Sequence, residues 1–174
     1  FENEEWLASR KLDGVRWIIR KEGTSVKAYS RQGNEFTTIQ KVLDDVKTMP
    51  GDFVLDGEIC LMDENGNEDF QGIMKQIKRK DHTIANPKYI IFDYLTLEEF
   101  DTKEGDTKLS DRLDRLYGGR TEVDTLSILA QVDIDSEQQL SDMIIDADAN
   151  GYEGVMLRKN VGYEGKRSKN LLKC

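Results

Sequence analysis

Lys11-Leu12-Asp13-Gly14-Val15-Arg16 is the stretch from which the fold and function of this chain can be worked out. Asp-Gly is a favoured hairpin dipeptide, and Trp17-Ile18-Ile19 reads as the returning strand. The stretch alone is therefore consistent with a charged hairpin turn. It is equally consistent with a reactive lysine that has an acid and an arginine at fixed offsets. The rest of the sequence decides between these two interpretations.

The composition restricts the chemistry. The 174 residues are 37% hydrophobic and 34% charged, which fits one substantial globular domain. Cys60 and Cys174 lack metal-type spacing, which suits free thiols in a reducing cytosol, and no membrane span or signal peptide is visible. His82 is the only histidine, which argues against histidine triads and histidine-rich metal sites. Lysine, arginine and carboxylates are left to carry any reaction.

The charge is unevenly distributed along the chain. The net charge is −9, and the stretch Thr121–Leu157 has nine acids and no lysine or arginine. Arg158–Lys173 reverses the balance with six basic residues, and a second basic run covers Lys75–Lys80. A polyanion responds to the local field rather than to the net charge, so a basic face for nucleic acid remains compatible with an acidic domain. Solvated charge is the alternative interpretation of the run at 75–80.

Hydrophobic periodicity and turn residues predict alternating strands and helices. An amphipathic helix is expected over 38–49, with a threonine cap before it, and Ser136 with Gln139 in capping-box position opens another. These patterns predict an α+β fold with mainly antiparallel β-sheets flanked by helices. The expected strands are 5–11, 15–20, 25–30, 52–62, 89–95, 126–134, 153–159 and 170–174, and the expected helices are 38–49, 70–77, 110–117 and 136–149.

Further motifs follow the lysine stretch in a fixed order. They are Ser30-Arg31-Gln32-Gly33, Leu55-Asp56-Gly57-Glu58-Ile59, Tyr89-Ile90-Ile91-Phe92-Asp93-Tyr94, Glu153-Gly154-Val155-Met156-Leu157-Arg158 and the terminal Leu171-Leu172-Lys173. Together they resemble the motifs of the covalent nucleotidyltransferases, and most closely those of ATP-dependent DNA ligases of the small viral and phage type.

This resemblance implies an ATP-grasp-like nucleotidyltransferase domain over residues 1–174. The last motif of the family usually has a second lysine, but here the sequence stops at Cys174, one residue after Lys173. We therefore expect the C-terminal OB-fold domain of such ligases to lie outside this chain.

The resemblance also implies which groups are catalytic. Lys11 would attack ATP and carry the covalent AMP, while Arg31 and Lys173 would hold phosphate oxygens. An attacking amine must be neutral, although lysine titrates near 10.4. Nearby cations disfavour the ammonium form, so we expect Arg16, Arg31 and Lys173 to activate Lys11 and to bind the nucleotide.

Other positions would bind the base, the ribose and a divalent cation. Glu58 and Glu153 are single acids on apolar strands. By resemblance Glu58 faces the ribose or the metal and Glu153 the metal, Mg²⁺ or Mn²⁺, whereas each would otherwise be a buried structural carboxylate. Phe92 would stack on adenine, although its pattern alone is typical of a core residue. Ser9 would lie beside the base, and Arg167 would contact a phosphate.

The resemblance implies the function of the adenylation domain of an ATP-dependent DNA ligase, a monomer that uses ATP on nicked double-stranded DNA in the cytoplasm of a bacterial or virus-infected cell. An RNA ligase or a capping-type nucleotidyltransferase is a close alternative, because these enzymes share the lysine motif. A non-catalytic nucleotide- or DNA-binding module of the same fold is a third possibility.

Overall fold

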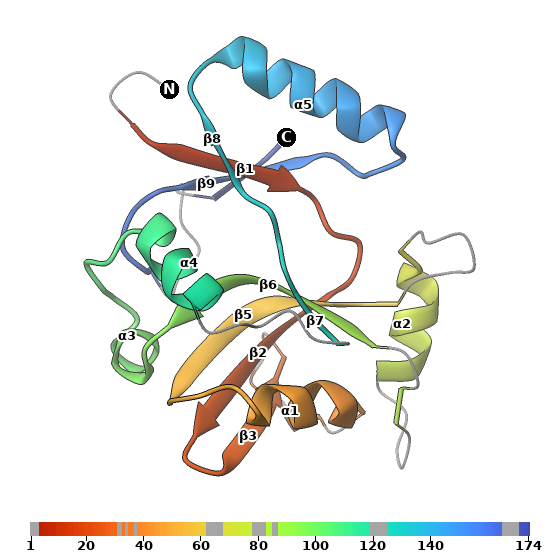
Figure 1. The fold of residues 1–174 in the computed structure, drawn as a ribbon. Coiled ribbons are helices and arrows are strands. Elements are labelled where there is room, and N and C mark those ends of the chain that lie inside the picture. The colour runs from red at the N-terminus through yellow and green to blue at the C-terminus, as the bar shows by residue number, and fades with distance from the viewer. Residues whose placement is uncertain are drawn as a thin grey trace.

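The computed structural model describes residues 4–30, 33, 35–36, 38–61, 68–77, 83–84, 87–118, 125–164 and 171–174. Two β-sheets lie one above the other, with helices around them (Figure 1). All strand pairs are antiparallel except β6 with β7, so the predicted α+β class with mainly antiparallel sheets is confirmed. The larger sheet has the order β4 (Glu35–Phe36), β3 (Ser25–Tyr29), β2 (Val15–Glu22), β5 (Phe53–Cys60), β6 (Lys88–Leu95), β7 (Leu126–Ile128). The smaller sheet has the order β10 (Leu171–Lys173), β9 (Val155–Lys159), β1 (Trp6–Arg10), β8 (Val132–Ile134).

The main hydrophobic core covers one face of the larger sheet. Alternate residues of the central strands are buried on this face, as the period of two of a β-strand requires. They pack against α1 (Gln40–Lys47), α2 (Phe70–Ile77) and α4 (Leu109–Gly118). Members of this core are Val15, Trp17 and Ile19 of β2, Phe53, Leu55 and Ile59 of β5, and Tyr89 and Ile91 of β6.

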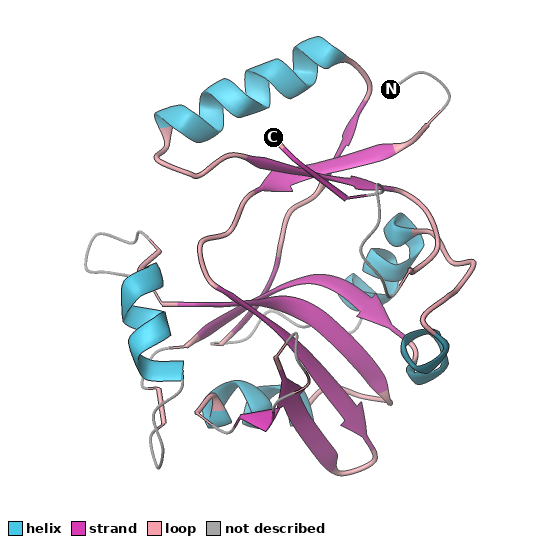
Figure 2. Cartoon of the chain, turned by 180° about the vertical axis from the view of Figure 1, so that it is seen from behind, coloured by secondary structure: helices cyan, strands magenta, loops and turns pink. Residues whose placement is uncertain are grey.

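The smaller sheet has a core of its own. Ala8 of β1, Ile134 of β8 and Val155 and Leu157 of β9 pack with Ala147 of α5 (Glu137–Ala149). This helix lies on the face of the smaller sheet that is turned away from the larger sheet (Figures 1 and 2). The alternation therefore turns the neighbouring residues Ser9, Met156 and Arg158 towards the larger sheet.

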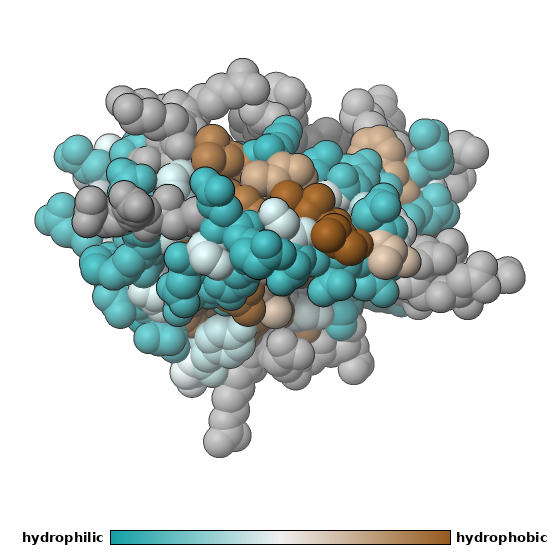
Figure 3. All heavy atoms as spheres, turned by 90° about the horizontal axis from the view of Figure 1, so that it is seen from above, coloured by the Kyte–Doolittle hydropathy of each residue, from teal (hydrophilic) through white to brown (hydrophobic). Residues whose placement is uncertain are grey.

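Seen from the side of α5, hydrophobic surface gathers among hydrophilic residues (Figure 3). Ile144, Ile145 and Tyr152 are exposed on α5 and the turn that follows it. Ile144, on the same helix as the partly buried Leu140 and Met143, is 37% exposed. Among the described residues, no helix is long and apolar enough to cross a membrane.

The prediction of one strand over 126–134 is wrong. The structure divides this segment into β7 in the larger sheet and β8 in the smaller sheet, and residues 129–131 cross between them (Figure 1). Leu129 is buried at the crossing, and its N–H donates to the carbonyl of Ile91. Gln131 donates its side-chain amide to the carbonyl of Phe92, at 2.9 Å. The crossing is thus fixed by β6, a long-range partner that a local pattern does not contain.

Two helix starts also differ from the prediction. The N-cap of α1 is Ile39, which makes no side-chain cap hydrogen bond, so the expected threonine cap is wrong. The helix α3 (Leu97–Thr102) stands where only acidic loops were expected, and Thr96 and Glu99 form its capping box. At α5 the Ser136 hydroxyl accepts from the N–H of Gln139, whereas the Gln139 side chain accepts from the N–H of Asp135 rather than from that of Ser136.

Candidate active site

Lys11 lies on the short connection between β1 and β2, where the chain passes from the smaller sheet to the larger one (Figure 1). Its backbone N–H donates to the carbonyl of Gly154, at 2.9 Å. Gly14, three residues later, approaches β5 so closely that a Cβ atom would clash with the carbonyl of Ile59. The glycine of this motif therefore has a packing role, and the lysine is anchored at the junction of the sheets.

The side chain of Lys11 forms an ion pair. Its Nζ lies 2.6 Å from Oε2 of Glu153, and the two side chains are 34% and 47% exposed. The hydrogen bond that Lys11 donates to Glu153 raises the pKa of Lys11 above its ordinary value. The expectation that neighbouring cations lower this pKa is therefore wrong for the nucleotide-free chain, in which carboxylates dominate around the amine.

The C-terminal strand ends at the same place. Cys174 and Val155 exchange two backbone hydrogen bonds, of 2.7 and 2.9 Å, which place the end of β10 beside Gly154. A Cβ atom on Gly154 would clash with the carbonyl of Cys174, so only glycine allows this approach. Lys173 precedes this contact on β10 and is exposed. The backbones of Lys11, Glu153 and Lys173 thus converge at one end of the smaller sheet.

Arg16 is held by Asp56. The guanidinium donates from Nε and Nη2 to the two carboxylate oxygens of Asp56, at 2.9 and 2.6 Å. This hydrogen bonding, followed by the charge of Asp56, raises the pKa of Arg16. Asp56 was not among the predicted site residues, although an acid on an apolar strand was visible in the sequence. Its side chain is only 6% exposed.

Glu58 lies two residues further along β5 and on the same face. Burial is the main reason why its pKa is raised to about 7, with the charge of Glu68 adding to the effect, while a hydrogen bond from the Gly14 N–H opposes it. Among the described residues, nothing donates a hydrogen bond to its buried Oε2 atom. A buried carboxylate oxygen without a partner is an acceptor available to a hydroxyl or a cation.

The described residues contain no group of three or more histidine, cysteine or acidic side chains that could hold a metal ion. Glu58 and Glu153 both act on Lys11 electrostatically, which places them around the same amine. The oxygen chemistry of the two carboxylates suits Mg²⁺ or Mn²⁺, while the remaining ligands of such an ion would have to come from water and phosphate.

Phe92 lies on β6 next to an irregularity in the ladder. The register with β5 shifts between Asp56 and Gly57, so that Phe92 has no partner opposite it. The ring is 7% exposed and is buried with four residues of the sheet junction. These residues are Leu12, Cys60, Ile90 and Leu129.

One side chain of the smaller sheet reaches Phe92. The guanidinium carbon of Arg158 lies 4.4 Å from the centroid of the ring, and Nη1 of Arg158 lies 3.1 Å from the hydroxyl oxygen of Ser9. The structure therefore brings Ser9 and Phe92 together through Arg158. Sequence reasoning missed this residue, because a basic side chain at the end of a strand reads as solvated.

A second buried ion pair lies beside Phe92. Arg112 of α4 donates to both carboxylate oxygens of Asp93, at 2.8 and 3.0 Å, and Nη1 of Arg112 also donates to the carbonyls of Thr107 and Val161. Burial raises the pKa of Asp93 despite this partner. The pair connects β6 to the segment that follows β9. In the sequence, the only indication of this pair was an arginine inside an otherwise ordinary amphipathic helix.

Arg31 and Arg167 lie outside the described residues, as do the side chains of the basic run Lys75–Lys80. Of the predicted site residues, the structure describes Ser9, Lys11, Arg16, Glu58, Phe92, Glu153 and Lys173, which all lie where the two sheets face each other.

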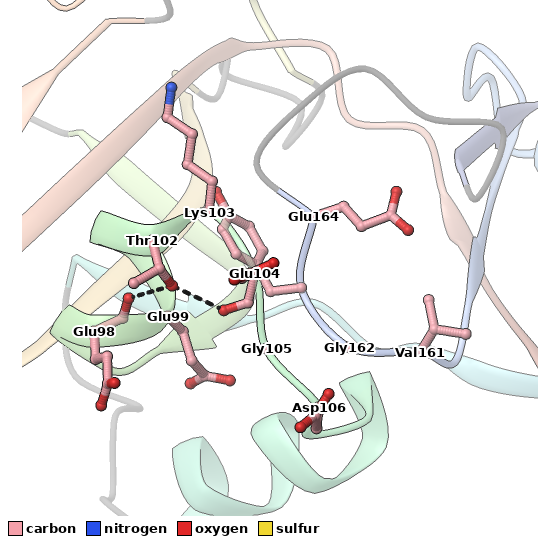
Figure 4. A pocket seen from close by; sticks show the side chains of 11 residues that line it. Glu98, Glu99, Thr102, Lys103, Glu104, Gly105, Asp106, Val161, Gly162 and Glu164 are labelled. Atoms are coloured by element: carbon pink, nitrogen blue, oxygen red, sulfur yellow. Dashed lines mark hydrogen bonds between the residues drawn. The ribbon is translucent and has the colours of Figure 1, made fainter.

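Two hollows that the described residues form differ in chemistry. A cavity of about 870 Å³ lies between α3 and residues 161–164, and Figure 4 shows that carboxylates project around it. None of the predicted site residues lines it, and its acids, Glu98, Glu99, Glu104, Asp106 and Glu164, would repel a triphosphate. A smaller hollow, of about 420 Å³, opens at the sheet junction and is lined by Ser9, Ile90 and Leu129, among others.

Comparison with known proteins identifies DNA ligases as relatives of this chain. The chain is 31% identical over 184 residues to the DNA ligase of Natronomonas pharaonis, which covers 98% of this chain and 32% of that protein. It is 32% identical over 181 residues to the DNA ligase of Methanococcoides burtonii, with 97% and 31% covered. The chain thus spans about a third of the length of these relatives. Their names do not favour the RNA-ligase and capping alternatives.

A solved structure supports the same assignment. The Chlorella virus DNA ligase-adenylate superimposes with a TM-score of 0.73 at 25% identity, and the match covers 97% of this chain and 60% of that one. The family described as ATP dependent DNA ligase domain matches residues 1–174, the full length of the sequence. A lysine at the junction of two sheets, surrounded by carboxylates, is thus found in a chain that belongs to the ATP-dependent DNA ligase domain family.

Proposed function

We propose that this chain is the adenylation domain of an ATP-dependent DNA ligase and that Lys11 is its nucleophile. The Nζ atom of Lys11 attacks the α-phosphorus of ATP, the bond to the β-phosphate oxygen breaks, and pyrophosphate leaves. The AMP then passes from Lys11 to the 5′-phosphate at a nick, and the 3′-hydroxyl displaces AMP to seal the strand. The observation that carries the proposal is the pairing of Lys11 with Glu153, at 2.6 Å, where the sheets meet.

The ion pair sets the resting state of the nucleophile. An ammonium group has no lone pair for attack, so Lys11 must lose its proton and its hydrogen bond to Glu153 before it reacts. Because Glu153 raises the pKa of Lys11, any change that draws this carboxylate away makes deprotonation easier. A Mg²⁺ or Mn²⁺ ion held by Glu153 and Glu58 would supply positive charge beside the α-phosphate.

The surrounding residues fit the parts of a nucleotide. Phe92 offers a ring face for the base, and Ser9 lies near that face. Glu58 has a free acceptor oxygen for a ribose hydroxyl. Lys173 is exposed on the strand that ends beside Gly154 and can approach the phosphates, together with Arg16. Arg31 and Arg167 complete the proposed phosphate contacts.

The DNA partner we propose is a nicked duplex, bound by a monomer. The exposed face of α5 carries Asp142, Asp146 and Asp148, and this charge disfavours the phosphate backbone there. The basic residues between Arg158 and Lys173 follow this acidic stretch in the sequence, and they are the proposed electrostatic contact. We further propose that residues 1–174 form one nucleotidyltransferase domain and that an OB-fold domain completes the enzyme.

Mass spectrometry of the intact chain, incubated with ATP and Mg²⁺, tests the proposal. We expect a covalent AMP adduct that peptide mapping assigns to Lys11. Lys11→Arg should give no adduct, because a guanidinium stays protonated. Lys103→Arg, a substitution at an exposed lysine of α3's C-cap, is the matched control and should keep the adduct. An adduct on another residue, or none with the native chain, would refute the assignment.

A further inference from the structure

Arg158 is fixed at two points on the inner face of the smaller sheet. Its guanidinium lies over the Phe92 ring, at 4.4 Å from the centroid, a distance typical of a cation–π contact. Nη1 donates to the Ser9 hydroxyl on the neighbouring strand β1. The side chain therefore spans the junction from β9 to β6.

The remaining surroundings of Phe92 are occupied. The ring is 7% exposed and packs in a cluster with Leu12, Ile90 and Leu129. A guanidinium and a purine are both flat groups that take the face of an aromatic ring at van der Waals distance. They cannot share one face, so a base can stack on the face that Arg158 covers only after Arg158 has moved.

The contacts of Arg158 are weaker than those of Arg16 and Arg112. Arg16 and Arg112 each donate two hydrogen bonds to an aspartate. Among the described residues, no carboxylate forms an ion pair with Arg158, and burial lowers its pKa. A bidentate pair between a guanidinium and a carboxylate is stronger than a single hydrogen bond from a guanidinium to a neutral hydroxyl. Of the three side chains, Arg158 is the one that can be released most easily.

We infer that Arg158 is a gate of the base pocket: its guanidinium closes the face of Phe92 on which the base stacks, and it must swing aside for adenine to bind. The inference rests on the proposed function, in which Phe92 receives the base. Arg158 thus acts against nucleotide affinity in the free domain, and the closed gate keeps the apolar ring from water.

Adenosine binding to the full chain, measured by titration calorimetry, tests the gate. Adenosine has no phosphate, so removing the positive charge of Arg158 does not remove a Coulomb attraction between the protein and the ligand. Removing a competing contact of cation–π strength should make Arg158→Ala bind adenosine about three- to thirtyfold more tightly than the native chain. Arg158→Lys, which keeps a cation but loses the flat group, should lie between the two.

Two controls isolate the contact. Lys159→Ala removes the same charge from the next residue of β9, whose side chain pairs with Glu4, and should leave adenosine affinity unchanged. In a Phe92→Ala background, Arg158→Ala should no longer increase affinity, since the two residues act through one contact. Thermal unfolding of each variant checks that the native fold is kept.

The outcomes separate the gate from the proposed function. Tighter adenosine binding by Arg158→Ala without AMP transfer to Lys11 supports the gate and refutes the function. AMP transfer with unchanged or weaker adenosine binding by Arg158→Ala overturns the gate and leaves the function intact. Absence of adenosine binding in every variant overturns both.

Discussion

Arg16 and Glu58 face each other in the β2–β5 register, yet Arg16 pairs diagonally with Asp56. The diagonal pairing uses both oxygens of Asp56 and leaves Oε2 of Glu58 without a partner among the described residues. Two acids on one strand face thus have different roles: Asp56 positions an arginine, and Glu58 stays available to a ligand.

Asp56→Asn should move Arg16 towards Glu58. The asparagine removes the charge that holds the guanidinium, and the facing carboxylate then becomes its nearest acidic partner. We expect the pKa of Glu58 to fall from its present value of about 7. Carbon-13 NMR of labelled glutamate carboxyls measures this pKa. Asp52→Asn, which removes an acid immediately before β5, is the control. An unchanged Glu58 titration in Asp56→Asn would argue against the coupling.

Glu58→Gln should stabilise the nucleotide-free chain at alkaline pH. The folded-state pKa of Glu58, about 7, is higher than its ordinary value of 4.5. The contribution of Glu58 to the free energy of unfolding is therefore fully present below pH 4.5 and is lost as the pH rises through 7. In the native chain this loss lowers the free energy of unfolding by about 2–3 kcal/mol between pH 4.5 and pH 8. Denaturant unfolding at several pH values should show that Glu58→Gln lacks this decrease. Parallel pH profiles for the two proteins would contradict the prediction.

Glu153→Gln should lower the pKa of Lys11 in the absence of nucleotide. The hydrogen bond that Lys11 donates to Glu153 is the largest cause of the raised pKa. Replacing this charged acceptor by a neutral amide therefore favours the neutral amine. NMR titration of isotopically labelled, methylated lysines reports the change. Glu4→Gln removes a carboxylate from Lys159 instead and should not affect the titration of Lys11. If both variants leave Lys11 unchanged, the ion pair does not control the nucleophile.

Phe92→Ala should weaken ATP binding by about 1–3 kcal/mol, the range of a base-stacking contact. It should also lower the melting temperature, because the ring is buried in the junction cluster. Ile90→Ala shortens a neighbour in the same cluster and serves as the control for lost packing. Equal effects of the two substitutions on ATP affinity would show that Phe92 is only a core residue.

Residues 1–174 by themselves should form the AMP adduct slowly and seal nicks poorly. The leaving pyrophosphate carries much of the charge of the transition state, and a ligase that lacks groups for it loses rate more than affinity. Binding to a nicked duplex should be weak and fall steeply with salt, given a net charge of −9. Gel analysis of a labelled nicked duplex with ATP and Mg²⁺ measures sealing. Efficient multiple-turnover sealing would overturn this expectation.

The sequence predicted the elements whose signals are local. Lys11 was placed on a turn between strands, α2 was predicted with its bounds, and Asn150-Gly151 was expected to end α5, where Asn150 is the C-cap. The motifs also predicted that Glu58 and Phe92 would lie near Lys11 because they follow one another in a known order. Turn and capping patterns of a few residues, and motifs that follow one another in a known order, are sufficient for such predictions.

Predictions failed where distant residues decide the structure. The chain leaves the larger sheet at Leu129 because β6 supplies its hydrogen-bond partner there. Arg158 lies over Phe92 because two sheets face each other, and neither residue indicates this by its neighbours in sequence. The raised pKa of Lys11 likewise depends on Glu153, which is 142 residues away. The α3 helix is the exception, since its capping box was legible in Thr96 and Glu99.

The position of Lys11 on the connection between the sheets has a mechanical consequence. Within the described residues, the chain passes between the sheets at 11–14 and again at 129–131. An AMP bonded to Lys11, with its base on Phe92 of the larger sheet, would add a further connection across the same junction, covalent at Lys11. The adenylated protein would then be a stiffer body than the free one, and the reaction intermediate would itself serve as a structural element of the fold.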